Sequence, residues 1–305
     1  TRRLTELEAE VATLHGLWGE AVAGAPVMAT VPHHHIYGLV FKLLWPLASG
    51  RPFAAALHHE LEALLASLPS SAVIVSSPAH LTRLGGLKPL PLCTRPRMVF
   101  SAGALLPKSA AEQAHKLFGV SPTEIYGSTE TGALATRQGD VPWQPLPGNR
   151  IAASTAGRLR VSAPYVAQRA SIELADRVSL TGDGRFHLLG RDDRIAKIEG
   201  KRVSLDDLER TLRELSLVMD AAALVLEDGP TLAAVVVPSL AGQEALNEEG
   251  AFRFGRTLRA ALSDTHDPAA LPRRWRFVDR IPEAALGKRP RDLLAALFRP
   301  QANEA

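Results

Sequence analysis

Short apolar segments alternate with amphipathic helical segments over the first 118 residues, and this alternation constrains the fold more than any other feature of the chain. Apolar strands are predicted at 25–31, 72–76 and 97–101, with helices at 60–68 and 108–118. An amphipathic helix with apolar residues at helical spacing precedes them all. Strands that alternate with helices form a largely parallel sheet. The sequence therefore predicts an α/β fold.

Glycines stand at the carboxyl ends of two strands of this predicted sheet. Gly103 follows the strand at 97–101, and Gly127 lies in the next such position, directly after Tyr126. Glycine lets the backbone turn tightly and approach a ligand closely. Because ligands of parallel sheets bind at the carboxyl ends of the strands, both glycines are candidates for a binding site.

The second glycine belongs to the run Glu124–Gly132, which reads Glu-Ile-Tyr-Gly-Ser-Thr-Glu-Thr-Gly. Ser128, Thr129 and Thr131 offer hydroxyls to phosphate oxygens, and Glu130 suits a hard divalent cation that bridges phosphates. The same composition also fits a polar turn that follows a strand. Taken by itself, the run leaves both interpretations open.

From residue 139 the pattern changes to short strands punctuated by tryptophan, proline and glycine. Such strands are predicted at 150–153, 157–162, 171–173 and 185–189, which favours a small β-barrel or sheet. Beyond them, Ser204 is predicted to cap a helix. Paired strands joined by a turn at Asp228–Gly229 are predicted next, followed by a helix at 252–262. We therefore expect three parts: an α/β subdomain at 1–138, a β-barrel-like subdomain at 139–192, and an α+β terminal domain at 193–305.

Composition excludes several classes of protein. Of the 305 residues, 46% are hydrophobic and 22% are charged, as in ordinary globular proteins. The pI is near 9.2, but acidic and basic residues are interspersed, which argues against a nucleic-acid-binding face. No apolar run approaches the roughly 20 residues of a membrane span. Cys93 is the only cysteine, so an internal disulfide is impossible, and we expect a cytoplasmic protein.

Three consecutive histidines, His33 to His35, suggest a metal site at first sight. Adjacent side chains on a turn or strand diverge, however, and no cysteine or acidic residue lies at ligand spacing. We instead expect a single histidine to face a cleft at the end of the strand.

Five segments occur in the order that is typical of the adenylate-forming superfamily: His35–Gly38, Ser101–Ala104, Tyr126–Thr131, Gly190–Val203 and Ile281–Lys288. The chain resembles this superfamily, which comprises acyl- and aryl-CoA synthetases, peptide-synthetase adenylation domains and luciferases, over essentially its whole length. The superfamily's Ser/Thr/Gly-rich phosphate loop, which should precede the first helix, is absent. We therefore expect an upstream portion to be missing, and we do not expect this truncated chain to turn over by itself.

The resemblance implies a two-step reaction with ATP and Mg²⁺. A carboxylate attacks the α-phosphate of ATP to give an acyl-adenylate and pyrophosphate, and a thiol then displaces AMP. The thiol belongs either to coenzyme A or to the phosphopantetheine arm of a carrier protein. Catalysis of such a reaction consists mostly of positioning and of neutralising developing charge.

The resemblance also assigns roles to residues of the first half. Glu130 would coordinate Mg²⁺, and Thr129 would contact the α-phosphate. Tyr126 would stack on adenine, with the Gly103–Ala104 backbone on the other side of the ring. His35 would lie near the substrate carboxylate.

Further roles follow for the second half. Arg191 has the fork geometry for ribose and phosphate oxygens, although a surface salt bridge would also explain it. Asp193 would be a hinge about which the terminal domain rotates between the two half-reactions. Gly200 would lie in the loop presented for the thiol step. Lys288 would bridge the attacking carboxylate and the α-phosphate; its alternative is a solvated surface lysine.

Two aspartates compete for the ribose hydroxyls. The triplet Thr181–Asp183 matches the superfamily's usual Thr-Gly-Asp, but Asp183 lies only seven residues before Gly190. Asp176 lies fourteen residues before it, which is the spacing that the superfamily uses. Because Gly182–Phe186 fits a hairpin turn, we assign Asp176 to the ribose and Asp183 to the turn.

Within the superfamily, the chain most resembles the bacterial ligases that load aromatic or fatty acids onto acyl carrier proteins. These include the ligases of aryl polyene and xanthomonadin-type pathways. The segments that carry this likeness are Gly184–Phe186, Lys197–Ser204 and Leu286–Lys288. The expected function is therefore activation of a carboxylic acid, such as a hydroxybenzoate, and its transfer to an acyl carrier protein. One alternative is transfer to coenzyme A. Another is a non-catalytic nucleotide-binding or scaffold protein.

Overall fold

The computed structural model describes residues 2–166, 171–226, 231–268, 271–284 and 289–299. The chain forms two compact units, which are described separately below. The first comprises residues 1–174 and 178–188, and the second comprises residues 175–177 and 189–305. The boundaries predicted at 138 and 192 stay a prediction.

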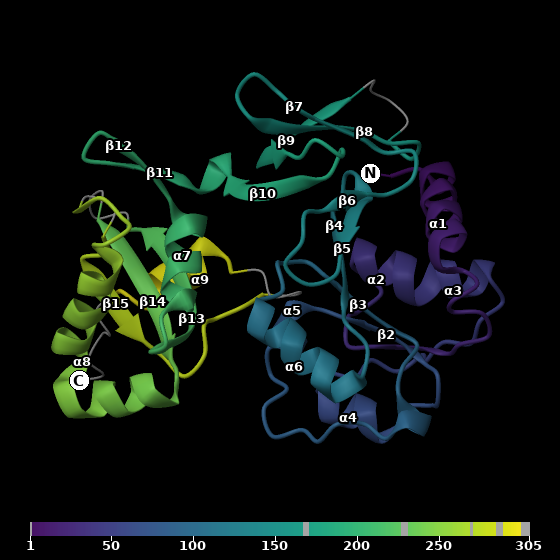
Figure 1. Cartoon of the computed structure of the whole chain (residues 1–305), viewed down its shortest axis with the longest axis horizontal. Helices are drawn as coiled ribbons and strands as arrows, with labels where there is room; N and C mark the ends of the chain where they lie inside the picture. The colour runs from purple at the N-terminus through teal and green to yellow at the C-terminus, as the bar shows by residue number, and fades with distance from the viewer. Residues whose placement is uncertain (1, 167–170, 227–230, 269–270, 285–288, 300–305) are drawn as a thin grey trace. The chain divides into compact units, whose positions relative to one another are not determined.

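A six-stranded sheet forms the centre of the first unit (Figure 1). Its strands run in chain order: β1 (Val27–Ala29), β2 (Val73–Ser76), β3 (Met98–Ala102), β4 (Thr123–Ser128), β5 (Gly132–Arg137) and β6 (Gln144–Pro145). Neighbours from β1 to β4 are parallel, whereas β5 and β6 join in antiparallel fashion. The predicted α/β sheet is thus confirmed, with a β4–β5 hairpin added at its end.

Helices cover both faces of this sheet. They are α1 (Leu4–Trp18), α2 (Ile36–Gly38), the π-helical η1 (Leu39–Leu44), α3 (Trp45–Ala48), α4 (Leu61–Ala66), α5 (Pro78–Leu81), the 3₁₀ turn η2 (Leu92–Thr94) and α6 (Lys108–Phe118).

Alternate residues of a strand point to opposite faces, and β3 shows the consequence. Val99 packs in one core with residues of α4, α5 and α6. Phe100 meets Trp18, Phe41 and Trp45 on the other face, with ring centroids 5.1, 5.2 and 5.9 Å away. In Figure 1, β2 and β3 accordingly lie between α2–α3 and α4–α6.

The predicted β-barrel region forms a four-stranded sheet with the order β10-β9-β8-β7. Its strands are β7 (Arg150–Ala153), β8 (Arg158–Ser162), β9 (Ile172–Leu180) and β10 (Phe186–Arg191). In the described part of the chain β7 and β10 are the two edges, so the sheet is open rather than a closed barrel. Strand β9 is longer than its predicted counterpart at 171–173.

The second unit contains a three-stranded sheet with the order β13-β14-β15 and helices on both faces. In chain order its elements are η3 (Asp192–Arg194), β11 (Ile195–Ile198), β12 (Lys201–Ser204), α7 (Leu205–Glu214), β13 (Val218–Val225), β14 (Leu232–Pro238), α8 (Leu240–Leu262), β15 (Arg274–Phe277) and α9 (Arg291–Ala296).

The predicted serine cap in this unit is confirmed, because the Ser204 side chain accepts a hydrogen bond from the Asp207 amide at 3.2 Å. Helix α8 begins earlier than the predicted 252 and bends at Gly250, whose φ is 77°. The turn predicted at Asp228–Gly229 lies outside the described residues. No helix within the described ranges is long and apolar enough to cross a membrane.

Candidate functional site

Strand β4 includes Tyr126 and Gly127 and ends at Ser128. Tyr126 pairs with Ala135 of β5, and Gly127 pairs with Ala133, so the register shifts by one residue between them. Such a shift is a β-bulge, a feature that often re-aims side chains beside active sites. A Cβ on Gly127 would lie 2.1 Å from the Gly132 carbonyl oxygen. Glycine is therefore required here by the close approach of β5.

Two of the three hydroxyls in the β4–β5 turn are used to hold the turn itself. The Ser128 and Thr131 hydroxyl oxygens lie 3.1 Å apart, and each accepts a hydrogen bond from a backbone amide of the turn. Thr131 is fully buried, whereas Thr129 and Glu130 are exposed. Of the three hydroxyls that could serve phosphate oxygens, Thr129 is thus the exposed one, at the tip of the turn.

The ring of Tyr126 is supported by an aromatic cluster. The Trp143 and Phe186 ring centroids lie 5.7 and 6.0 Å from the Tyr126 centroid. The Arg137 guanidinium lies over the Trp143 ring, 4.6 Å from its centroid. Packing of this kind fixes the plane of Tyr126, as a platform for a nucleobase requires.

A buried carboxylate that the sequence did not single out joins the two glycine-bearing segments. Glu124 accepts a hydrogen bond from the Leu106 amide at 2.8 Å and forms a two-pronged ion pair with Arg137 at 2.8 and 3.2 Å. It thereby ties the loop that starts at Gly103, where φ is 103°, to the β4–β5 hairpin. Burial raises the pKa of Glu124, and Arg137 opposes that rise. Its position in a buried strand was the one signal available beforehand.

His35 caps the amino terminus of α2, in a loop that follows β1. Its carbonyl accepts a hydrogen bond from the Leu39 amide at 2.7 Å, and its ring lies 4.6 Å from that of His34. The ring is half-buried, whereas His33 and His34 are exposed. Close packing fixes the backbone here, because a Cβ on Gly38 would lie 2.1 Å from the Pro32 carbonyl oxygen.

Three of the predicted site residues come together in the second unit. The Arg191 guanidinium donates to both oxygens of Asp193 at 2.9 and 2.7 Å, and to Asp176 at 3.4 Å. The hydrogen bonds from Arg191 to Asp193 lower the pKa of the Asp193 carboxyl. The Arg191 amide donates to Asp206 at the start of α7, which fixes this segment on the unit. The salt bridge left open as an alternative for Arg191 is therefore present.

Asp183 occupies the β9–β10 turn, as the spacing predicted. It accepts hydrogen bonds from the Arg185 amide at 3.3 Å and from Arg185 Nε at 2.6 Å, and its other partner is the Thr181 hydroxyl. These hydrogen bonds lower the pKa of Asp183 far below its usual value. All its contacts in the described structure are local to the turn.

Two predicted site residues remain, Gly200 and Lys288, and the structure describes only the first of them. Gly200 forms the turn between β11 and β12 with Glu199; both have positive φ, 83° and 50°. Open space surrounds the position where a Gly200 Cβ would stand. Lys288 lies outside the described residues. Its neighbour Arg289 is held by Asp220 at 2.5 and 3.1 Å.

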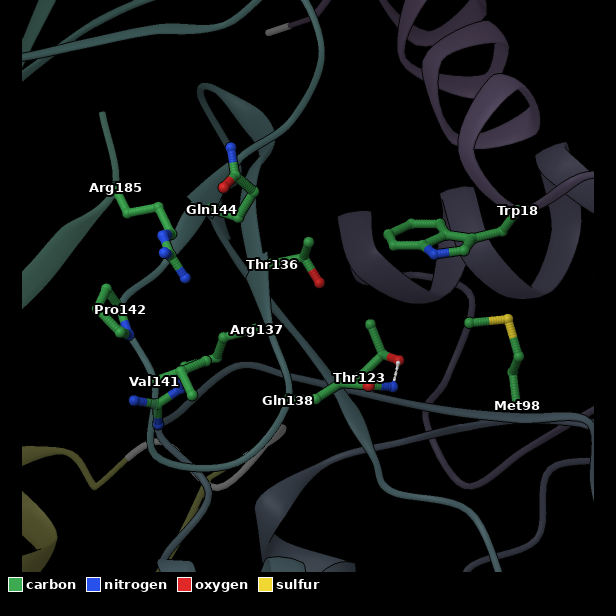
Figure 2. A pocket seen from close by; sticks show the side chains of 10 residues that line it. All are labelled: Trp18, Met98, Thr123, Thr136, Arg137, Gln138, Val141, Pro142, Gln144 and Arg185. Atoms are coloured by element: carbon green, nitrogen blue, oxygen red, sulfur yellow. Dashed lines mark hydrogen bonds between the residues drawn. The ribbon is translucent and has the colours of Figure 1, made fainter. Parts of the chain in front are cut away.

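A separate hollow of about 360 Å³ opens at the amino-terminal ends of β3 and β4 (Figure 2). Met98 and Thr123, the first residues of these strands, line it, together with Trp18, Arg137 and Arg185 among others. Its lining includes none of the predicted site residues. Since it lies at the end of the strands opposite the Thr129–Glu130 turn, it is not the site that the motifs predict.

The chain has recognisable relatives. A family model described as "AMP-binding enzyme" matches residues 5–162, just over half of the chain. A 4-coumarate–CoA ligase of Cereibacter sphaeroides is 29% identical, with 86% of this chain and 59% of the relative covered. A benzoate–CoA ligase of Thauera aromatica is 27% identical, with 83% of this chain and 54% of the relative covered.

The fold is also shared with a solved structure, that of ATP-bound MatB from Rhodopseudomonas palustris. That structure has a TM-score of 0.76 and 19% identity, and the match covers 96% of this chain and 64% of MatB. The chain spans little more than half the length of the two CoA ligases. Because the family model matches more than half of its residues, the chain belongs to the AMP-binding enzyme family.

Proposed function

We propose that the protein carrying this chain activates a carboxylic acid with ATP, giving an acyl-adenylate and pyrophosphate, and then transfers the acyl group to a thiol. The observation that carries the proposal is the β4–β5 turn. Its Ser128 and Thr131 side chains hold each other, while Thr129 and Glu130 are exposed at the carboxyl end of a parallel strand. Ligands of open α/β sheets bind at that end.

The first unit supplies the groups for phosphate and base. Glu130 would bind a magnesium ion, which neutralises charge on the phosphates when it is present. In the described part of the chain, no group of three or more acidic, histidine or cysteine side chains could hold a metal. This fits Mg²⁺, which usually takes one or two carboxylates with waters and substrate phosphates. Thr129 would donate to the α-phosphate, and Tyr126 would stack on adenine.

His35 and the loop at Gly103 and Ala104 complete the proposed contacts of this unit. The loop's positive-φ glycine exposes backbone that would line the other face of the adenine. His35, half-buried at the start of α2, would donate a hydrogen bond to the substrate carboxylate and so orient it for attack.

Residues of the second unit have distinct proposed roles. Asp176 would accept hydrogen bonds from the ribose hydroxyls. Arg191, which donates to the Asp176 carboxylate, would donate to ribose and phosphate oxygens. Asp193 would be the hinge of the terminal domain, and Gly200 would leave room for the thiol. Lys288 would bridge the attacking carboxylate and the α-phosphate, where an ammonium acts as a mobile point charge.

The relatives favour coenzyme A over a carrier protein as the thiol. Both the 4-coumarate and the benzoate relatives are CoA ligases. We therefore place coenzyme A first and keep the carrier protein, suggested by the likeness to carrier-protein ligases, as the second candidate. Both relatives act on aromatic acids, which supports an aromatic acid such as a hydroxybenzoate here.

The test uses protein expressed from the complete gene and a panel of aromatic and fatty acids. Release of AMP and pyrophosphate is measured with each acid, and coenzyme A then competes with a holo-carrier protein for the acyl group. We expect AMP release with at least one aromatic acid and a coenzyme A thioester as the main product. Acylated carrier protein as the main product would reverse the choice of acceptor. No AMP release with any acid would support a non-catalytic nucleotide-binding or scaffold role instead.

A further inference from the structure

A buried carboxylate from α1 contacts the base of the Thr129–Glu130 turn. Glu10 is 2% exposed, and its Oε1 accepts a hydrogen bond from the Ala133 amide at 2.8 Å. Ala133 is the second residue of β5, two positions after the turn ends at Thr131. The two partners are 123 residues apart in sequence. A carboxylate is rarely this buried unless it has a specific partner.

The β-bulge explains why this amide takes a side-chain partner. Bulges disrupt the regular ladder of hydrogen bonds between strands and leave a backbone group to be satisfied elsewhere. The shift between Tyr126 and Gly127 occurs where Ala133 pairs with β4. The Ala133 amide is buried and therefore needs a hydrogen-bond acceptor, and Glu10 provides it.

The Ala133 carbonyl is held from a third segment. The Tyr165 hydroxyl donates to it, and Tyr165 is fully buried. Asn149 Nδ2 in turn donates to the Tyr165 oxygen at 2.8 Å and to the Leu134 carbonyl at 2.9 Å. Both polar groups of the Ala133 backbone are thus captured by buried side chains from elsewhere in the chain.

Glu10 also limits which residue can stand at position 132, next to the turn. Gly132 has a φ of 68°, and a Cβ there would lie 2.4 Å from Glu10 Oε2. That oxygen is also the partner of Arg2, whose side chain is 5% exposed. Glu10 thus binds the hairpin through Oε1 and Arg2 through Oε2, and its carboxylate occupies the space where a Gly132 side chain would stand.

We propose that Glu10 is a positioning residue for the nucleotide site: through the Ala133 amide it fixes the direction in which the β4–β5 turn presents Thr129 and Glu130. The inference rests on the proposed function of that turn. In this proposal Glu10 acts through the turn and would not itself touch phosphate or metal. A loss of its acceptor oxygen loosens the turn and weakens binding of Mg·ATP, while the fold of α1 is retained.

The experiment compares Glu10→Ala, Glu10→Gln and Val11→Ala in protein from the complete gene. Glutamine keeps the acceptor oxygen for the Ala133 amide. Val11, next to Glu10 on α1 and 8% exposed, provides a control that loses buried side-chain volume without a polar contact to the hairpin. Hydrogen exchange of a peptide covering 128–134 reports on the turn, and calorimetry gives the Kd of a non-hydrolysable Mg·ATP analogue.

We expect faster exchange and about a tenfold higher Kd in Glu10→Ala, equivalent to about 1.4 kcal/mol. Glu10→Gln should stay within about threefold of wild type, and Val11→Ala should lower the Tm without changing Kd or exchange at the turn. Equal rises in Kd for Glu10→Ala and Val11→Ala, or no rise in either, would overturn the inference. If the wild type binds no nucleotide, the proposed function fails. Unchanged exchange in Glu10→Ala would then refute the positioning role separately.

Discussion

Replacement of Gly127 by alanine tests the close approach of β4 and β5 beneath the phosphate turn. The new Cβ would lie 2.1 Å from the Gly132 carbonyl oxygen and 2.9 Å from its carbon. Cβ contacts under 3.0 Å are essentially never observed. The strands must therefore separate by about 0.9 Å, from 2.1 to at least 3.0 Å, and both atoms belong to backbone that cannot rotate away.

Overpacking of this kind costs about 1–3 kcal/mol in the free energy of unfolding. Because the strands separate next to the turn, Thr129 and Glu130 move with them, and a misplacement of about 1 Å can lower catalysis about 100-fold. We therefore expect Gly127→Ala to lose both stability, measured by urea denaturation, and acid-dependent AMP release.

Gly182→Ala is the matched control. It places a Cβ in open space in the β9–β10 turn, at a glycine without positive φ, so its stability should change by less than about 1 kcal/mol. Wild-type stability and activity in Gly127→Ala would refute the argument from the close approach. An equal loss in both variants would attribute the effect to glycine replacement in general.

Three further predictions concern individual side chains. Asp176→Asn should raise the KM for ATP by about tenfold or more, since a hydrogen bond to a charged group is worth about 1.5–3 kcal/mol and each 1.4 kcal/mol is about a factor of ten. Asp183→Asn should leave the KM unchanged, and equal KM values for both variants would contradict the ribose assignment. Lys288→Ala should lower adenylation about 100-fold or more and spare acyl transfer from preformed adenylate, and equal loss of both steps would contradict its role. Burial raises the pKa of Glu124, so its carboxyl favours folding fully below about pH 4.3 and progressively less as the pH rises through the raised pKa. Urea midpoints at several pH values should therefore show the advantage of wild type over Glu124→Gln shrinking as pH increases, and a growing advantage would contradict this sign.

Local patterns in the sequence were sufficient for most elements of the fold. The strands at 72–76 and 97–101 and the helix at 108–118 match β2, β3 and α6 to within a residue or two, because their apolar periodicity has one solution in a buried sheet. The Ser204 cap was also predictable from local sequence, because a capping hydrogen bond joins residues only three positions apart.

Contacts between distant segments were not predictable in this way. Nothing near Glu10 indicates that its partner is the Ala133 amide, and nothing near Glu124 indicates that it would bind Arg137 and the Leu106 amide. The turn chemistry was also ambiguous: Ser128 and Thr131 are as suitable for phosphate as Thr129 by residue type. Only the geometry of the bulged hairpin separates the hydroxyls that hold the turn from the one that faces outward.

The most direct test of the central claim, that the Thr129–Glu130 turn binds the magnesium and phosphates of ATP, is acid-dependent ATP–pyrophosphate exchange at varied Mg²⁺ concentration. It compares wild type with Glu130→Gln, which keeps the size of the side chain and removes its charge. The account predicts exchange in the wild type, and in Glu130→Gln a rate lower by about 100-fold that is partly restored by excess Mg²⁺. An unchanged rate and Mg²⁺ dependence in Glu130→Gln would contradict it.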